Sequence, residues 1–475
     1  MDVIQLINDI DSFVWGPAMI ALLLGSHIFL TIRTGFIQRK LPQAIKISLS
    51  NGSGEGDISG FGALATALAA TIGTGSIVGV ATAVLAGGPG AILWMWLTGI
   101  FGMATKYSEV YISLKYRVKD ENGQMVGGAM YAWERAFKRE DGSTPWWAKI
   151  GAVAFAVFTA LAALGIGCAV QASSMTGIIT SSGVEVEPWI IGLVIVVLSA
   201  IPIFGGVSAI SNLCEKIVPF MAIGYALGCV VILVMNGAYI GESFALIFQC
   251  AFTGQAAFGG AVGSGIMVAL QFGCARGLFS NESGLGSAPI VSAAARSANP
   301  AEQALIAMTG TFWSTVVICL LTGIVLVSTM LAYPEVGQAI LAAPDTFSGA
   351  TLAATAFSKI PYIGTPLLVV GMVCFSYSTI VGWSYYGNRA VTYLFGVKGI
   401  KPYQVIYVAM AFLGAIGVGD IAWTISDITN ALMAIPNIIV VLLLSGIVAK
   451  GTKYFVYGNR LTEQYKEEVP TVKEC

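Results

Sequence analysis

The sequence predicts an all-α integral membrane protein. Of its 475 residues, 56% are hydrophobic and only 10% are charged, and the mean hydropathy is +0.81. Soluble domains carry about 25% charged residues. The apolar residues form long continuous runs, whereas a transmembrane β-barrel has short segments of alternating polarity. Helices are therefore the predicted spanning elements.

The apolar runs predict about 11 transmembrane helices. In chain order they cover residues 12–33, 59–86, 90–116, 148–181, 188–206, 216–236, 256–285, 302–332, 361–394, 403–419 and 428–449. The early charges are acidic, so the first run does not resemble a cleavable signal peptide. Arg33, Arg39 and Lys40 follow this run, which predicts an external N-terminus and a cytoplasmic first loop. With eleven spans, the C-terminus is cytoplasmic and the remaining basic residues fall mostly on the cytoplasmic side.

The chain divides into four expected parts. Residues 1–50 form an additional N-terminal helix with a cytoplasmic loop, and residues 51–240 and 241–450 form two sets of five helices. Residues 451–475 form a polar, frayed cytoplasmic tail. Two polar connections, 119–149 and 333–360, contain segments that could be short helices or solvated loops.

The second span contains polar and glycine residues near its middle. It reads LAATIGTGSIVGVATAV from Leu68 to Val84, with Gly73, Thr74, Gly75 and Ser76 in sequence. A glycine weakens a helix by about 1 kcal/mol relative to alanine. Any backbone group freed in hydrocarbon costs several kcal/mol unless it finds a partner. This pattern predicts a broken helix that lines a ligand site, although glycines that only allow close helix packing remain an alternative.

A second glycine-rich span begins the second set of five helices. Residues 259–286 read GGAVGSGIMVALQFGCARGLFSNESGLG, with Gly263, Gly265 and Gly273 expected at mid-span. Spans 2 and 7 run in opposite directions, so spans 2–6 and 7–11 have opposite topology. Paired broken helices in two inverted halves indicate a transporter whose site lies at the membrane midplane.

The chemistry of such a site favours a zwitterion. Freed amides at a helix N-terminus attract a carboxylate, and freed carbonyls attract an ammonium group or a sodium ion. A sugar would need many polar side chains, which are sparse in these spans. A small neutral amino acid is therefore the predicted substrate.

Three motifs resemble one family of transporters. GGPGAILWMWLTGIFG (Gly87–Gly102), GTGSIVGVATA before it and RGLFSNESGLGS after Cys274 are similar to the alanine/glycine:cation symporter family, the sodium:alanine symporters. The resemblance covers nearly the whole chain. It implies a LeuT-type fold, in which an additional first helix precedes a 5+5 inverted repeat with broken helices at spans 2 and 7. It also implies sodium-coupled import of alanine or glycine.

The resemblance implies a set of substrate-binding residues. The amides of Thr74 and Gly75 would hold the carboxylate, and the carbonyl of Thr71 would face the ammonium group. Gln171 would donate a hydrogen bond to the substrate. Phe272, Gly273 and Trp383 would form the wall of the pocket. Ser76 departs from the asparagine that is usual in the family, which puts a second cation site in doubt.

The same resemblance implies a sodium site. Its ligands would be the carbonyl groups of Ala69 and Ile72 and three oxygens on the ninth span. Phe375, Ser378 and Thr379 have the i, i+3, i+4 spacing that places these three oxygens on one helix face. The alternative is that both hydroxyls bond back to their own helix.

The ionisable residues bear on the coupling ion. Lys106, Glu109, Arg276 and Glu282 are expected in the cytoplasmic halves of their spans, as an inner gate or a structural ion-pair cluster. The single histidine, His27, lies in the additional first helix. Since no carboxylate or histidine is expected beside the pocket, sodium is favoured over protons.

Other functions remain as alternatives. A glutamine carrier or proton-coupled carrier of the same fold would share most of these features, and an ion channel could also use broken helices. An enzyme is disfavoured because no nucleophile, acid–base or metal cluster is evident, and the eight cysteines have no metal-binding spacing. We expect no cofactor beyond sodium as coupling ion, no nucleic-acid partner at a net charge of −1, and a monomer in a bacterial or archaeal cell membrane.

Overall fold

The computed structural model describes residues 3–50, 54–182, 185–253, 265–342, 347–417, 419–465 and 467–472. It is mostly helical, at 81%. Within these residues, seven helices are long and apolar enough to cross a membrane. They are Gln5–Arg33, Trp146–Ser181, Gly206–Met235, Pro300–Ala332, Gly364–Phe395, Val397–Ile416 and Ala422–Leu443. The integral membrane class is thus confirmed, and the count of eleven spans stays a prediction.

The first half of the chain contains helices α1 to α12 and one small hairpin. The helices are α1 (Val3–Val14), α2 (Pro17–Arg33), α3 (Leu41–Ser48), α4 (Gly60–Thr71), α5 (Val78–Gly87), α6 (Gly90–Lys115), α7 (Ala129–Ala136), α8 (Trp146–Leu164), α9 (Val170–Ser181), α10 (Pro188–Phe204), α11 (Gly206–Met235) and α12 (Ile240–Thr253). Strands β1 (Val118–Lys119) and β2 (Met125–Val126) pair antiparallel, with Val118 opposite Val126. The π-helical segment Gly165–Ala169 joins α8 to α9 without a break.

The second half contains helices α13 to α22. They are α13 (Ile266–Asn281), α14 (Ala288–Ser292), α15 (Pro300–Thr311), α16 (Leu320–Ala332), α17 (Pro334–Ala342), α18 (Gly349–Phe357), α19 (Gly364–Phe395), α20 (Ile400–Ile416), α21 (Gly419–Leu443) and α22 (Ser445–Gly451). A second π-helical segment, Phe312–Cys319, joins α15 to α16.

The helix starts follow from local sequence. The hydroxyl of Ser59 accepts the amide of Gly62 at the start of α4, and the side chain of Asn299 accepts two amides at the start of α15. Proline occupies the first turn of α2, α10 and α15, where its missing N–H costs nothing. The short helices expected within the two polar connections are present as α7 and α18.

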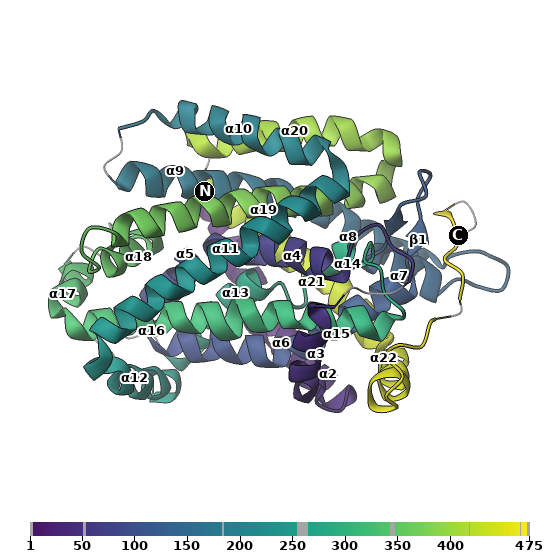
Figure 1. Cartoon of the computed structure of the whole chain (residues 1–475), viewed down its shortest axis with the longest axis horizontal. Coiled ribbons are helices and arrows are strands. Elements are labelled where there is room, and N and C mark those ends of the chain that lie inside the picture. The colour runs from purple at the N-terminus through teal and green to yellow at the C-terminus, as the bar shows by residue number, and fades with distance from the viewer. Residues whose placement is uncertain are drawn as a thin grey trace.

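The long helices run roughly side by side along the longest axis of the molecule (Figure 1). Helices α10 and α20 form an outer pair, α19 packs against α8 and α11, and α6 packs against α13 and α15. Helices α17 and α18 lie at one end of Figure 1, and β1, α7 and the C-terminus lie at the opposite end. This separation agrees with the opposite sides predicted for the two polar connections.

Several predicted boundaries were wrong. Helix α11 begins at Gly206, ten residues before the predicted span 216–236, because a polar segment there continues the helix. Helix α12 was not predicted as a separate element, and it buries only one face, with Ser243, Ile247 and Cys250. Of the predicted span 256–285, residues 256–264, with Gly263, lie outside the described residues.

The C-terminal tail does not have the frayed structure that its polar sequence suggested. The amide of Tyr465 donates to the carbonyl of Ala298 at 2.8 Å, and the side chain of Asn299 donates to the carbonyls of Leu461 and Glu463 at 2.8 and 3.0 Å. The amide of Lys119 donates to the carbonyl of Pro470 at 2.8 Å. The tail therefore docks on the segments that follow α14 and α6.

Candidate functional site

The helix expected to break at residues 73–76 is interrupted there. Helix α4 ends at Thr71, one 3₁₀ turn covers Thr74–Ser76, and α5 begins at Val78. The amide of Ser76 donates to the carbonyl of Gly73 at 3.2 Å rather than four residues back to Ile72. The carbonyl of Ile72 therefore lacks the partner that an α-helix would give it, among the residues described here. These groups are buried inside the protein.

Oxygen atoms from α19 converge on the end of α4. The hydroxyl of Thr379 donates to the carbonyl oxygen of Ala69 at 2.8 Å and to that of Phe375 at 3.0 Å. The hydroxyl of Ser378 donates to Phe375 at 2.9 Å and lies 3.5 Å from the carbonyl oxygen of Ala69. Ser378 and Thr379 are each 1% exposed. Four of the five predicted sodium ligands thus lie together.

This oxygen cluster has the chemistry of a weak site for a hard cation. Carbonyl and hydroxyl oxygens are neutral, hard donors, and both hydroxyls can rotate so that their lone pairs point to an ion. The alternative use of these hydroxyls, hydrogen bonding to their own helix, also occurs, because both donate to the carbonyl of Phe375 on α19. The two uses are compatible because the same oxygens also face Ala69 on another helix. The fifth predicted ligand is the carbonyl of Ile72, which lacks the hydrogen-bond partner that an α-helix would give it.

Gln171 on α9 also contacts the interruption, in addition to the residues of α4 and α19. Its Oε1 accepts the amide of Thr74 at 3.4 Å, and its Nε2 donates to the carbonyl of Ile166 at 3.0 Å. Ile166 belongs to the π-helical segment between α8 and α9. A Cβ placed on Gly73 would lie 2.5 Å from Thr379 Oγ1 and 3.2 Å from Gln171 Oε1. Gly73 therefore permits α9 and α19 to approach the interruption together.

The two threonines at the interruption differ in their bonding. The hydroxyl of Thr71 donates to the carbonyl of Ala67 at 2.9 Å, within its own helix. The hydroxyl of Thr74 is buried and has no hydrogen-bond partner among the described residues. An unpaired buried hydroxyl costs free energy, so Thr74 is a candidate to contact a bound ligand.

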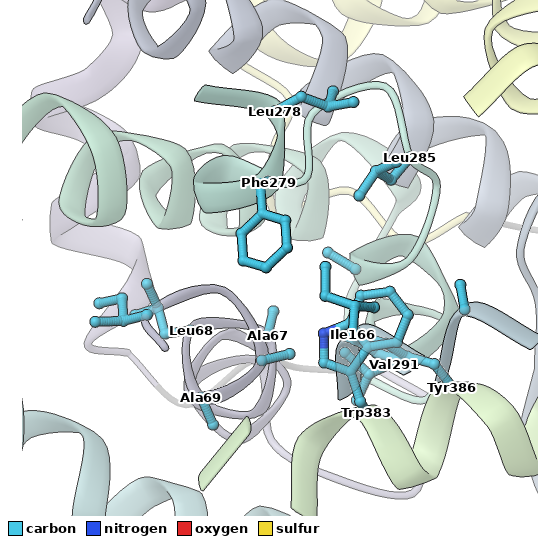
Figure 2. Close-up of a cluster of buried hydrophobic side chains, with 14 of the residues drawn as sticks. Ala67, Leu68, Ala69, Ile166, Leu278, Phe279, Leu285, Val291, Trp383 and Tyr386 are labelled. Atoms are coloured by element: carbon cyan, nitrogen blue, oxygen red, sulfur yellow. The ribbon is translucent and has the colours of Figure 1, made fainter. Parts of the chain in front are cut away.

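Gly75 and Ser76 face α13. A Cβ on Gly75 would lie 2.4 Å from Cδ1 of Phe279, and the hydroxyls of Ser76 and Ser280 are 3.1 Å apart. The carbonyl of Ser76 accepts the hydroxyl of Thr322 at 3.1 Å. Figure 2 shows the ring of Phe279 pointing from α13 toward the helix that carries Ala67 and Ala69.

The predicted wall residues Phe272 and Gly273 lie elsewhere. A Cβ on Gly273 would lie 2.5 Å from the carbonyl oxygen of Ala91 and 2.7 Å from Cβ of Trp94, so Gly273 packs against α6. Phe272 is half-buried beside Gly87, at the far end of α5. Helix α13 is continuous through Gly273. The aromatic ring next to Gly75 belongs to Phe279, two turns further along.

Trp383 is fully buried on α19, one turn beyond Thr379. Its Cβ packs against Gly167 of the π-helical segment, and its ring meets that of Tyr386 edge to face at 5.3 Å. Figure 2 shows Trp383 beside Ile166. Trp383 thus packs between α19 and the π-helical segment that precedes α9.

The structure also reveals an ion pair that the sequence prediction missed. Arg276 on α13 makes two hydrogen bonds to Asp427 on α21, at 2.9 and 3.2 Å. The ring of Phe279 stacks on Trp423 with centroids 5.3 Å apart, and the guanidinium of Arg276 lies over both rings. The signal in the sequence was Asp427, an acid inside an apolar run.

Arg276 does not belong with the other buried charges, contrary to the expectation. Helices α5 and α13 are antiparallel, because Gly75 meets Phe279, Gly79 meets Arg276 and Gly87 meets Phe272. Arg276 therefore lies further along α5 from the interruption than Phe279 does, toward Gly87. The ion pair and the two rings cover the interruption on that side.

Lys106, Glu109 and Glu282 do lie together, with Ser287 and Asn437; we call these five residues the inner cluster. The ammonium of Lys106 donates to the carbonyl of Glu282 at 2.7 Å and lies 3.9 Å from Glu109 Oε2. Glu109 Oε1 accepts the side chain of Asn437 and, at 2.8 Å, the amide of Gly284. Ser287 donates to the carboxyl group of Glu282.

The inner cluster surrounds a second chain interruption. Helix α13 ends at Asn281 and α14 begins at Ala288. Between them, Glu282, Gly284 and Gly286 have φ of 53°, 103° and 77°. The left-handed backbone is costly for Glu282, which has a Cβ, and natural for the glycines. A chain interruption therefore lies at 282–287, directly after α13.

Comparison with known proteins gives consistent matches. The family model described as the sodium:alanine symporter family matches residues 1–470. The chain is 48% identical over 460 residues to the sodium/alanine symporter AgcS of Methanococcus maripaludis, covering 96% of this chain and 98% of the relative. It is 43% identical over 475 residues to an uncharacterized transporter of Haemophilus influenzae, covering 99% and 100%. The structure resembles MhsT in complex with L-phenylalanine, with a TM-score of 0.58, 14% identity and coverage of 86% and 95%.

Proposed function

The chain belongs to the sodium:alanine symporter family, and we propose that it imports a small neutral amino acid, alanine or glycine, together with sodium. Membership confirms the resemblance read from the motifs, and the family consists of transporters rather than enzymes. The structural likeness to MhsT supports a LeuT-type fold.

The observation that carries the proposal is the convergence of oxygens on the end of α4. The hydroxyls of Ser378 and Thr379 on α19 lie 3.5 and 2.8 Å from the carbonyl oxygen of Ala69 on α4. A sodium ion between them would replace hydroxyl-to-carbonyl hydrogen bonds with ion–oxygen contacts. The carbonyls of Phe375 and Ile72 would complete the shell. Neutral ligands suit a transported ion, because binding must remain reversible.

The substrate would lie next to this ion, at the interruption. The amides of Thr74 and Gly75 would hold its carboxylate at the N-terminal end of α5, and the carbonyl of Thr71 would face its ammonium group. Gln171 already accepts the Thr74 amide and could turn to the substrate. Phe279 leaves little room beside Gly75, which favours a small side chain, and Trp383 would form another wall. The hydroxyl of Ser76 contacts that of Ser280 on α13, so its proposed role is a contact between helices.

Transport would occur by alternating access. The interruptions at 72–77 and 282–287 give hinges in the first helix of each proposed half, 51–240 and 241–450. Eleven spans with an external N-terminus would place the docked tail, 451–475, on the cytoplasmic side of a bacterial or archaeal cell membrane. The membrane potential adds about 2.3 kcal/mol per 100 mV for each sodium ion that enters.

Uptake of radiolabelled alanine into proteoliposomes tests the proposal. We expect uptake only with an inward sodium gradient, and competition by unlabelled glycine. Competition by glutamine alone would favour a glutamine carrier, and uptake without sodium would contradict the ion site. Counterflow, in which internal alanine accelerates uptake of labelled alanine, distinguishes this carrier from a channel.

A further inference from the structure

The inner cluster contains more acidic than basic side chains. Lys106 and Glu109 are each 2% exposed and Glu282 is 1% exposed. These groups lie deep in the protein, beside the interruption at 282–287. Glu109 Oε2 is buried without a hydrogen-bond partner among the described residues. The cluster is separate from the proposed sodium ligands, which lie on α4 and α19.

The inner cluster has one positive charge too few to be neutral. Two carboxylates and one ammonium would give a net charge of −1 in a site without water access. The other titratable groups that face the cluster, in the part of the chain described, are His27 on α2 and Tyr386 on α19. Nδ1 of His27 lies 2.8 Å from the hydroxyl oxygen of Thr105, which carries no charge. Since a buried net charge is costly within a membrane, one additional positive charge should bind here.

The two carboxyl groups have different environments. Glu109 accepts hydrogen bonds from the amide of Gly284 and the side chain of Asn437, and it lies beside the ammonium of Lys106. These donors favour its charged form. Lys106 donates to the backbone carbonyl of Glu282, not to its carboxyl group. The hydroxyl of Ser287 contacts that carboxyl group, and a hydroxyl can pair with either a carboxylate or a carboxylic acid.

From this arrangement we propose that the carboxyl group of Glu282 is a proton-binding site that controls opening toward the cytoplasm. The proton forms an O–H bond on the Glu282 carboxyl group and makes the cluster neutral while the interruption is packed. Its loss to cytoplasmic water leaves a net negative charge that favours hydration of the cluster. Glu282 is the first residue of the 282–287 interruption, so hydration there would release α14 from α6. The proposal rests on the proposed transport function.

The first test is the pH dependence of sodium-driven alanine uptake, with equal pH on both sides of proteoliposomes. The wild-type rate should rise between pH 5.5 and 8.5, by at most about tenfold per pH unit, the limit for one proton. Glu282→Gln imitates the protonated carboxyl group, so its rate should be flat near the wild-type value at low pH. The control Glu242→Gln, in the first turn of α12, should keep the wild-type profile. A wild-type profile in Glu282→Gln would overturn the proposal.

A second measurement does not depend on a variant that folds. When sodium and alanine are added to purified wild-type protein in weak buffer, a pH indicator should report proton uptake or release that varies with starting pH. No change at any pH would overturn the proton site. If uptake is absent at every pH, the proposed transport function fails, and the indicator experiment still decides whether a proton binds.

Discussion

The hydroxyl of Thr379 donates a 2.8 Å hydrogen bond to the carbonyl oxygen of Ala69. The two residues are 310 positions apart and belong to α19 and α4, one helix in each proposed half of the chain. In a regular helix this carbonyl would accept an amide from residue 73. The interruption therefore turns a backbone acceptor of one half toward a side-chain ligand of the other, and an ion bound between them would join the two halves.

Replacement of both hydroxyls should weaken sodium coupling. In Ser378→Ala with Thr379→Ala, the sodium concentration for half-maximal alanine uptake should rise about tenfold or more, since two ion ligands are lost, at about 1.4 kcal/mol per tenfold. Ser384→Ala is a matched control, because Ser384 is buried on the same helix and, within the described part of the chain, its hydroxyl bonds only to the carbonyl of Val381. Unchanged sodium dependence of the double variant at normal expression would exclude this ion site.

A side chain on Gly75 should abolish alanine binding. A Cβ there would lie 2.4 Å from Phe279, whereas a Cβ on Gly79 would meet only Arg276 Cδ, at 3.9 Å. We expect no detectable alanine binding by calorimetry for Gly75→Val and near wild-type binding for Gly79→Ala. Gly75→Ala combined with Phe279→Leu separates the two causes. Restored binding in that variant would mean that the glycine serves helix packing alone.

The sequence predicted the elements of this site that depend on local pattern. The stretch from Gly73 to Ser76 was recognisable because glycines and hydroxyls interrupt an apolar run. The family resemblance pointed to Phe375, Ser378 and Thr379, and their spacing places their oxygens on one helix face. Both arguments require only residues that are near one another in sequence, and the structure brings both sets together.

Contacts that depend on helix rotation and depth could not be predicted in the same way. Phe272 and Gly273 lie on the α6 side of α13, and only the packing of α13 against α5 identifies Phe279 as the ring beside Gly75. The same packing places Arg276 beside Gly79, away from the inner cluster. The docking of the tail could not be predicted because the tail takes part through backbone groups, which are the same in every sequence.

The ion pair of Arg276 and Asp427 should hold the external side closed. Asp427→Asn removes one charge of a pair whose side chains are 14% and 11% exposed, and should speed release of bound alanine to the outside several-fold. Protein that carries radiolabelled alanine is diluted into sodium buffer, and the label that stays bound is measured over time. Lys359→Gln, at an exposed ion pair with Glu335, is the control and should release alanine at the wild-type rate. Slower release in Asp427→Asn would contradict a closing role.

Loss of the tail contacts should destabilise the protein by an amount that can be traced to one side chain. Asn299 has two functions: its Oδ1 accepts the amides of Ala301 and Glu302 at the start of α15, and its Nδ2 donates to two tail carbonyls. Asn299→Asp keeps the cap and removes both donors. At about 0.5–1.5 kcal/mol for each hydrogen bond, the melting temperature in detergent should fall measurably.

Deletion of the chain after Gly458 should give a larger fall, because it removes the tail contacts of Tyr465 and Pro470 as well. In the deleted protein, Asn299→Asp should have no further effect, since the donors already lack their acceptors. Asn122→Asp, whose amide nitrogen rather than side chain is used in the turn with Asp120, is the control. If the two changes add, Asn299 acts on α15 independently of the tail, and its hydrogen bonds to the tail do not contribute to stability.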